Sequence, residues 1–489
     1  MKKIIENIKK QLKEYDLDGY VIPKNDEYFS EYSEKDRLRL VSNFTGSAGY
    51  AVILRKKNYL FVDGRYTLQA KIESGKYFKI EAYEKLFNCK IFKNLKLGID
   101  PKLFTKDQIK NFFSNNKIII LKKNIVDNII KFKKKKVKPF YSLSEIIVGE
   151  GYKKRIQKIV NFLKKNNLEY IFITAPENIA WILNIRGYDN PNSPIPNSNL
   201  IISKKGKKWI IANKDKLKNL IKQKKINNKE VLESEDIEKF NISQNRKNIS
   251  IDSKTCSIYN EEILRKKFNV KKIEDPIYLL KSVKNKTEIK NMIKAHISDG
   301  VALTKFIYWI KKINKKKITE VDAEKKLEKF RRMNKSFLYP SFDTIAGTGK
   351  NGAIVHYRAK KDNCRTINKK DVFLCDSGGQ YRYGTTDVTR TICFSDQSKN
   401  IKNIFTKVLK GHIAVAKTNL NKDNIGKKID KRAREFLKKS NLDYAHGTGH
   451  GVGFFLNVHE GPQSITKINT VKIKEGMILS NEPGYYKEN

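Results

Sequence analysis

Two aspartates in the last third of the chain have the types and spacing to form one chemical site. Asp376 ends an apolar segment, 372–376, that is typical of a buried strand, and Asp387 lies near the start of a second predicted strand, 385–392. If the two strands close as a hairpin, their carboxylates come close together. Paired carboxylates repel each other unless a proton or cations lie between them, and hard oxygen ligands suit Mn, Mg or Zn. On these residues alone, a metal site and a pair of turn-capping acids are equally well supported.

Histidine is scarce, and most of it lies near these acids in the sequence. The 489 residues contain six histidines, of which His296 and His412 fall in predicted helices and are expected to be ordinary surface or core residues. A single histidine is more often structural than functional, but four beside such acids favour a site. These four lie in glycine-rich or β-like segments: His356, His446, His450 and His459.

Glycine-rich segments near the histidines do not match the known phosphate-binding motifs. Gly449 and Gly451 lack the further glycine that a dinucleotide fingerprint requires three places later. Thr344 stands where a phosphate loop around Gly349 would need glycine. No Gly-x-Ser-x-Gly elbow is present, which weakens a serine-hydrolase interpretation. A third acid, Glu482, follows an apolar segment that we predict to be a strand, just before a Pro-Gly turn.

Two similar units precede the elements that must position these residues. Residues 12–22 and 163–173 share one pattern, the end of an amphipathic helix followed by an apolar strand, at an offset of 151. Chance similarity between two helix–strand units is the alternative. The repeat predicts two tandem α/β domains, 1–143 and 144–281, and each contains further predicted strands: 50–54, 59–62, 200–202 and 209–211.

A helix start signal marks the third domain. Asn285 and Glu288 have the spacing of a capping box, and helical apolar periodicity follows over 289–313. We therefore expect a catalytic domain over 282–489, and we interpret the lysine run at 133–136 as a solvated linker.

Composition limits the possible classes of protein. With 39% hydrophobic and 10% aromatic residues, the chain is neither disordered nor fibrous, and no apolar run reaches the roughly 18 residues of a membrane helix. The N-terminus lacks a signal-peptide core, so a cytoplasmic location is expected. The net charge of +50 is spread along the chain, which predicts a diffusely basic surface without a specific nucleic-acid or membrane partner; polyanion binding is the alternative. Five scattered cysteines without a Cys-x-x-Cys pair predict reduced thiols.

Taken together, the motifs resemble the pita-bread metallopeptidases, and within them the three-domain Xaa-Pro aminopeptidases. The fold class that this resemblance implies is α/β, with two tandem creatinase-like N-terminal α/β domains and an α+β pita-bread catalytic domain. The segments that carry the resemblance lie along the whole chain: 44–49, 62–66, 181–187, 351–357, 376–381, 384–391, 449–453 and 481–485.

The resemblance also implies a ligand set. Asp376 would bind one metal ion, Asp387 would bridge two, and His450 and Glu482 would each bind one of them. The cofactors would be two divalent ions, usually Mn²⁺ in this family, with Zn²⁺ or Co²⁺ as alternatives.

Catalytic roles follow from the same resemblance. Glu482 would act as the general base, while His356 and His459 would donate to the substrate carbonyl oxygen as negative charge develops. His446 would be a substrate-pocket residue or would support a ligand from outside the metal shell.

The implied function is hydrolysis of the N-terminal Xaa-Pro bond by a metal-activated water. The implied partners are peptides with proline in second position and, at full length, a second copy in a homodimer. A prolidase, which cleaves Xaa-Pro dipeptides, and a non-catalytic pita-bread binding protein are the alternatives. The family has one further bridging glutamate on a later strand, whereas this chain ends at Asn489. We therefore expect the catalytic domain to be incomplete at its C-terminus and its activity to be weak or absent.

Overall fold

The computed structural model describes the chain in two packed units. It describes residues 1–489 apart from 88–90, 133–135, 234–236, 238–246, 314–317 and 488–489. One unit comprises Met1–Ser144 and Glu150–Ile277, and the other Glu145–Gly149 and Tyr278–Asn489. Cys89 and most of the predicted lysine linker lie outside the described residues. The predicted domain boundaries stay predictions.

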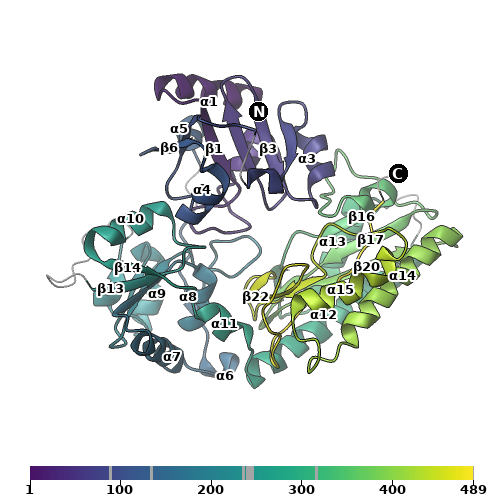
Figure 1. The fold of residues 1–489 in the computed structure, drawn as a ribbon. Helices are drawn as coiled ribbons and strands as arrows, with labels where there is room; N and C mark the ends of the chain where they lie inside the picture. The colour runs from purple at the N-terminus through teal and green to yellow at the C-terminus, as the bar shows by residue number, and fades with distance from the viewer. Residues whose placement is uncertain (88–90, 133–135, 234–236, 238–246, 314–317, 488–489) are drawn as a thin grey trace. The chain divides into compact units, whose positions relative to one another are not determined.

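The first unit begins with a mixed sheet of six strands in the order β4-β3-β2-β1-β5-β6 (Figure 1). Strand β1 pairs antiparallel with β2 and parallel with β5. Its strands and helices are α1 (Lys2–Glu14), β1 (Gly19–Pro23), α2 (Arg37–Ser42), β2 (Tyr50–Leu54), β3 (Asn58–Val62), α3 (Thr67–Ser74), β4 (Lys79–Ala82), η1 (Tyr83–Leu86), β5 (Lys96–Ile99), α4 (Lys106–Phe113), β6 (Lys117–Ile120) and α5 (Ile125–Ile129).

Both faces of this sheet are buried, because successive side chains of a strand point to opposite faces. Tyr20 and Ile22 of β1 pack in the same core as α1, whereas Val21 packs in the core that includes Phe112 and Phe113 of α4. The near-continuous apolar strands seen in the sequence follow from this two-sided burial.

A second sheet repeats the first. Its order is β12-β11-β10-β8-β13-β14, and β8 pairs antiparallel with β10 and parallel with β13, as β1 does with β2 and β5. The predicted tandem pair of similar α/β folds is confirmed. The elements are β7 (Tyr141–Ser142), α7 (Tyr152–Lys165), β8 (Tyr170–Ile173), α8 (Pro176–Ile182), β9 (Ile185–Arg186), β10 (Asn199–Ser203), β11 (Lys208–Ile211), α9 (Lys214–Lys222), η2 (Asn228–Glu230), β12 (Val231–Leu232), β13 (Asn248–Ile251), α10 (Ile258–Lys267) and β14 (Asn269–Lys272). Helix α11 (Ile277–Ser282) follows, and all of it but Ile277 belongs to the other unit.

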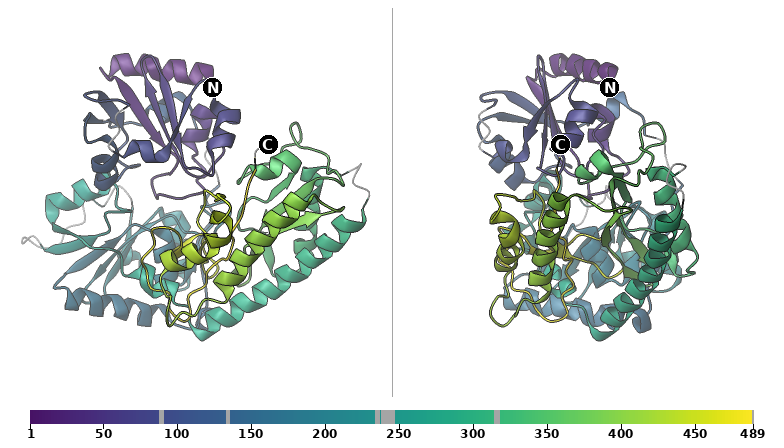
Figure 2. Two further views of the ribbon diagram at one scale, coloured as in Figure 1. Left: turned by 45° about the vertical axis from the view of Figure 1, so that its right-hand side comes forward. Right: turned by 90° about the vertical axis from the view of Figure 1, so that its right-hand side faces the viewer.

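The other unit combines long helices with short sheets, β15-β18-β19, β16-β17-β20 and β21-β22. The predicted capping box is confirmed, since Asn285 and Glu288 cap α12 reciprocally. Helices α14 and α15 lie side by side (Figure 2). Its elements are α6 (Glu145–Val148), α12 (Lys286–Lys312), α13 (Glu320–Arg332), β15 (Phe337–Pro340), β16 (Ile345–Thr348), η5 (Gly349–Ala353), β17 (Val372–Ser377), β18 (Gly379–Tyr381), β19 (Gly384–Thr385), β20 (Val388–Cys393), α14 (Lys399–Ala416), α15 (Gly426–Lys438), β21 (Gly449–Gly451) and β22 (Glu460–Ile465).

Two local expectations differ from the structure. The stretch between the paired strands β17 and β20 was expected to be a turn, but it contains strands β18 and β19 of another sheet. The apolar strand predicted before Glu482 is not regular: its pairing is limited to isolated bridges, Val283 with Met477 and Gly451 with Leu479. Alternation of apolar residues could not reveal either. Strand β18 also pairs with β15, and the bridges of the last segment join Met477 and Leu479 to residues far away in the sequence.

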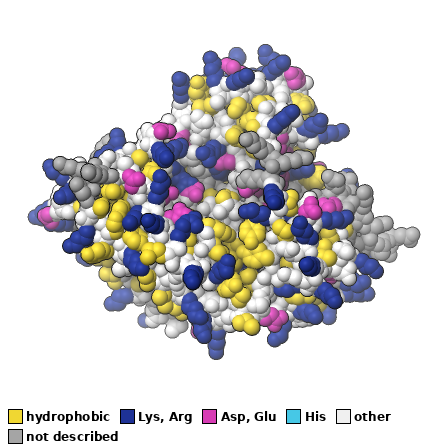
Figure 3. Space-filling model, turned by 180° about the vertical axis from the view of Figure 1, so that it is seen from behind, with side chains coloured by type: hydrophobic (Ala, Val, Ile, Leu, Met, Phe, Trp, Pro, Cys, Tyr) yellow, Lys and Arg dark blue, Asp and Glu magenta, His cyan; other side chains and the backbone are white. Residues whose placement is uncertain are grey.

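One face of the molecule shows how its positive charge is distributed. On the face shown in Figure 3, lysine and arginine side chains are scattered among other types and do not form one stripe. Among the described residues, none of the helices has the length and apolar character needed to cross a membrane. The four described cysteines are all free thiols.

A buried ion pair joins helices α12 and α13, and its loss should lower the stability of the fold. Arg331 Nε donates to Asp299 Oδ1 at 2.7 Å, and both side chains are almost fully buried. We expect Asp299→Ala to lower the free energy of unfolding by about 3–5 kcal/mol, because it leaves the arginine charge buried and unpaired. Urea unfolding measures the change. The control is Asp396→Ala, which removes an exposed pair with Lys402 and should leave the free energy of unfolding almost unchanged. Equal losses in the two variants would contradict the prediction.

Candidate metal centre

Three of the predicted ligands converge in space. Asp387 directly precedes β20, His450 is the central residue of β21, and Glu482 lies in the C-terminal segment. One ligand atom from each lies within 4.8 Å of the other two. The Nε2 atom of His450 is 3.2 Å from Asp387 Oδ2 and 3.1 Å from Glu482 Oε1. Two carboxylates and an imidazole therefore face one point.

Glycines on both sides of His450 allow this convergence. A Cβ atom on Gly449 would lie 2.1 Å from Ser480 O, and one on Gly451 would lie 2.4 Å from Glu460 O. Any larger residue would push away either the segment that carries Glu482 or strand β22. The glycine-rich pattern around His450 is therefore a packing requirement of the site.

Ser480 links two of the ligands. The His450 N–H donates to Ser480 Oγ at 2.9 Å, and the Ser480 N–H donates to His450 O at 2.8 Å. The Ser480 hydroxyl in turn donates to Glu482 Oε1 at 2.5 Å. The Glu482 N–H donates to Thr448 O at 2.8 Å, so the irregular segment is fixed along β21 without forming a regular strand.

The ring of His450 is oriented for ligation. Its Nδ1 atom lies 2.9 Å from Gly451 O, which suits a proton on Nδ1 and leaves Nε2 facing the two carboxylates, where a metal ion would take the place of its proton. Burial disfavours the protonated, charged form of the ring. Hydrogen bonds to Asp387 and Glu482 outweigh this effect of burial and raise the pKa of His450 well above its ordinary value. Burial likewise opposes the charge on Glu482, but the hydrogen bond and the charge of His450 lower the pKa of that carboxyl to about 2.

Asp376 supplies a third acid close to these residues. It lies in β17 opposite Thr389 of β20. Burial, and then the charges of Asp387 and Glu482, raise the pKa of Asp376 well above its usual value. Its Oδ1 atom is buried, and no hydrogen-bond partner reaches it within the described part of the chain. An oxygen without a partner among repelling carboxylates is what a divalent cation would satisfy, so the donor set fits metal ions.

The three other predicted histidines take different positions. The His459 ring centroid is 4.4 Å from that of His450, in an edge-to-face arrangement. The His446 ring is 5.5 Å from that of Tyr486, and its Nδ1 lies 2.7 Å from Gly447 O. His356 is half-buried in the turn after η5. The catalytic and binding roles of all seven predicted residues stay predictions.

Two residues near the site were missed by the sequence interpretation. Removal from water, together with the Asp376 and Glu482 charges, raises the pKa of Tyr486, so its hydroxyl stays a neutral donor. His412, expected to be an ordinary helical residue, has its Nδ1 3.1 Å from Asn481 O, while Asn481 Nδ2 donates to His412 O at 2.9 Å. No signal in a single sequence marks either residue, because both contacts join distant segments.

A buried arginine holds the segment that leads into β21. Arg434 of α15 donates from Nε to Asp430 Oδ2 at 2.8 Å and from Nη2 to His446 O at 2.6 Å. Asp430 Oδ1 also accepts from Thr448 Oγ1 at 2.6 Å. The strand that carries His450 is thus tied to a helix by charge-assisted hydrogen bonds.

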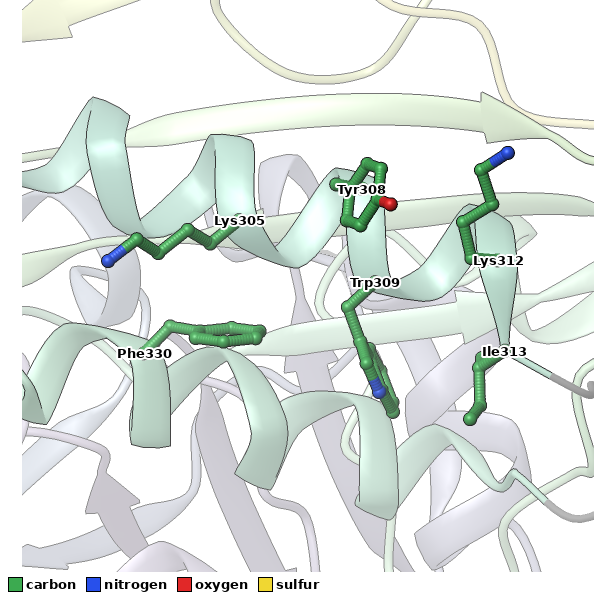
Figure 4. A pocket seen from close by; sticks show the side chains of 6 residues that line it. All are labelled: Lys305, Tyr308, Trp309, Lys312, Ile313 and Phe330. Atoms are coloured by element: carbon green, nitrogen blue, oxygen red, sulfur yellow. The ribbon is translucent and has the colours of Figure 1, made fainter.

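A hollow on the surface of this unit offers no comparable chemistry. It lies over helices α12 and α13 (Figure 4), and its lining contains no carboxylate or imidazole. The lining residues are Lys305, Tyr308, Trp309, Lys312, Ile313 and Phe330.

Comparison with known families and proteins agrees with this architecture. The profile of metallopeptidase family M24 matches residues 290–489, and two creatinase/prolidase N-terminal domain profiles match residues 4–121 and 131–288. These matches confirm the predicted fold class.

Similar proteins extend over nearly the whole chain. A probable Xaa-Pro aminopeptidase P of Laccaria bicolor is 35% identical, over 99% of this chain and 79% of its own length. Xaa-Pro aminopeptidase 1 of Dictyostelium discoideum is 34% identical, over 99% and 82% respectively.

Solved structures give the same result. The X-prolyl aminopeptidase of Caenorhabditis elegans, described as a cytosolic enzyme with a di-nuclear active site, superposes with a TM-score of 0.90 at 26% identity, covering 99% of this chain and 85% of that one. The prolidase of Pyrococcus horikoshii has a TM-score of 0.56 at 26% identity and covers 68% of this chain and 91% of its own. The chain therefore belongs to the Xaa-Pro aminopeptidase P family of metallopeptidases.

Proposed function

We propose that the protein is a metallo-aminopeptidase that hydrolyses the bond between an N-terminal residue and a following proline. The observation that carries this proposal is the convergence of Asp387, His450 and Glu482 within 4.8 Å, with Asp376 beside them. Family membership and the names of the relatives support it.

The four ligands would hold two divalent cations, as the di-nuclear description of the Caenorhabditis elegans enzyme suggests. We propose Mn²⁺, with Zn²⁺ or Co²⁺ as alternatives. When bound, such a pair lowers the pKa of a water and neutralises the charge that develops on oxygen during hydrolysis.

The chain's own side chains would handle the protons. Glu482, whose Oε1 already accepts from Ser480 Oγ, would take the proton of the attacking water. His459, next to His450, and His356 would donate hydrogen bonds to the substrate carbonyl oxygen as its charge grows. His446 would line the substrate pocket. The proline nitrogen of the substrate carries no N–H, so the pocket needs no acceptor for it.

The remaining expectations belong to the same proposal. A cytoplasmic location follows the description of the Caenorhabditis elegans enzyme as cytosolic. A homodimer of the full-length protein, without a nucleic-acid or membrane partner, is the expected assembly. Prolidase activity is the competing function, because a prolidase structure shares part of the fold.

Removal of one ligand should remove metal and activity together. We expect Asp387→Asn to lose bound metal and to lower kcat/KM on Xaa-Pro peptides by at least about 100-fold, since even residues that only support a ligand cost 10- to 100-fold. Elemental analysis and a peptide hydrolysis assay with Mn²⁺ measure the two effects.

The matched control is Asp396→Asn, an exposed acid of the same unit that pairs with Lys402. It should keep the metal content and activity of the parent protein. Full metal content and turnover in Asp387→Asn would rule out its assignment as a ligand.

Peptide length should separate the two candidate activities. We expect release of the first residue from Xaa-Pro-Xaa tripeptides and longer peptides, and no release from matched Xaa-Ala peptides. Mass spectrometry of the products measures both, and treatment with EDTA should abolish release until Mn²⁺ is restored. Cleavage of Xaa-Pro dipeptides alone would identify a prolidase, and absence of both bound metal and cleavage would favour a binding protein.

A further inference from the structure

One buried carboxylate outside the metal centre closes the loop that carries His356. Glu320 is the first residue of α13 and is 0% exposed. The loop runs from Thr348, at the end of β16, to Arg365. The Glu320 side chain binds both ends of this loop. It also binds Tyr357, the residue after His356.

The contacts of Glu320 account for both of its oxygens. Oε1 accepts from the Thr348 N–H at 2.7 Å, and Oε2 accepts from the Arg365 N–H at 2.8 Å. The Tyr357 hydroxyl donates to Oε2 at 2.8 Å. The Asn351 amide donates to both oxygens, at 3.1 and 3.0 Å, and also reaches the Tyr357 hydroxyl at 2.9 Å.

The backbone strengthens this closure. The Glu320 N–H donates to Arg365 O at 3.0 Å, and the Ile367 N–H donates to Ile318 O at 2.8 Å. At its other end the loop continues β16, which pairs antiparallel with β17 so that Ile345 lies opposite Asp376. The loop is therefore anchored on one side to α13 and on the other to the strand that carries a predicted metal ligand.

Every group that contacts the Glu320 side chain is a donor. A carboxylate can accept a hydrogen bond from each of these donors, and buried charge-assisted hydrogen bonds are strong. A glutamine of the same shape has one acceptor oxygen, and its NH₂ group would face donors, which leaves buried polar groups unsatisfied. The requirement at this position is for negative charge, not only for a side chain of this size.

We propose that Glu320 is a positioning residue for catalysis: it fixes the loop so that His356 meets the substrate carbonyl oxygen beside the metal centre. This inference rests on the proposed function. Tyr357, the neighbour of His356, transmits the constraint, because its hydroxyl is held by Glu320 and its ring is buried.

A double-mutant cycle distinguishes positioning from general stability. The variants are Glu320→Gln, His356→Ala and their combination, with Glu328→Gln as control, since Glu328 forms a surface pair with Arg332 on the same helix. We expect Glu320→Gln to lower kcat on an Xaa-Pro peptide by about 10- to 100-fold, as misplacement of a catalytic group does. KM and bound metal should change little, and Glu328→Gln should match the parent.

In the His356→Ala background, Glu320→Gln should have almost no further effect on kcat, because the group that it positions is gone. Independent, multiplying losses in the double variant would overturn the proposal. An unchanged kcat in Glu320→Gln would overturn it as well.

Two further measurements keep the outcome clear. Tyr357→Phe removes only one donor and leaves the Glu320 carboxylate with its other hydrogen bonds. It therefore tests the proposal even if Glu320→Gln does not fold. It should lower kcat by about 3- to 10-fold, and only when His356 is present.

Amide hydrogen exchange at Thr348 and Arg365 should lose protection in Glu320→Gln. Absence of both bound metal and cleavage in the parent protein would refute the proposed function, whereas retained protection in Glu320→Gln would refute the closure of the loop by Glu320.

Discussion

Repulsion between carboxylates dominates the catalytic unit. Asp387 and Glu482 come from separate elements and meet at His450, and Asp376 lies near enough for their charges to act on it. Burial makes the repulsion between these charges stronger than it would be in water. Burial, and then the charges of Asp387 and Glu482, raise the pKa of Asp376, while hydrogen bonds to the same two carboxylates raise the pKa of His450 against the effect of burial. A fold that gathers these groups must hold each of them against that repulsion.

The surrounding structure meets this requirement with buried charges placed one or a few residues from the site. Arg331 donates to Ser377 Oγ at 3.0 Å, immediately after Asp376, while it also binds Asp299. Lys284 binds Glu460, which follows His459, and both side chains are buried. Each bond acts on a strand or loop rather than on a ligand itself. The ligands thus keep their lone pairs available, and the stabilisation comes from groups that never face the site. Arg434 and Glu320 do the same for the His450 strand and the His356 loop.

Local features of this fold could be predicted from the sequence, and long-range ones could not. The paired α/β sheets follow from apolar strands after amphipathic helices, and the Asn285–Glu288 capping box needs only four consecutive residues. The site residues were named through family motifs. The pairing of β18 with β15, the irregular segment before Glu482 and the role of Ser480 were not foreseen, because each is decided by a partner many residues away. Glu320 gives no signal in one sequence, since a glutamate at the start of a helix is ordinary.

The large positive charge of the chain does not neutralise this acidic centre. Lysine carries its charge at the end of a flexible stem and keeps it in water, where salt screens it within about 10 Å. The two most buried lysines near this part of the fold, Lys281 and Lys284, are directed to Glu460 and not to the three converging ligands. Neutralisation of the centre therefore needs a cation that is small enough to lie among Asp376, Asp387 and Glu482. It must also coordinate several carboxylate oxygens at once. A divalent cation meets both conditions; the His450 ring, whose pKa is raised, offsets part of this charge through its bonds to Asp387 and Glu482.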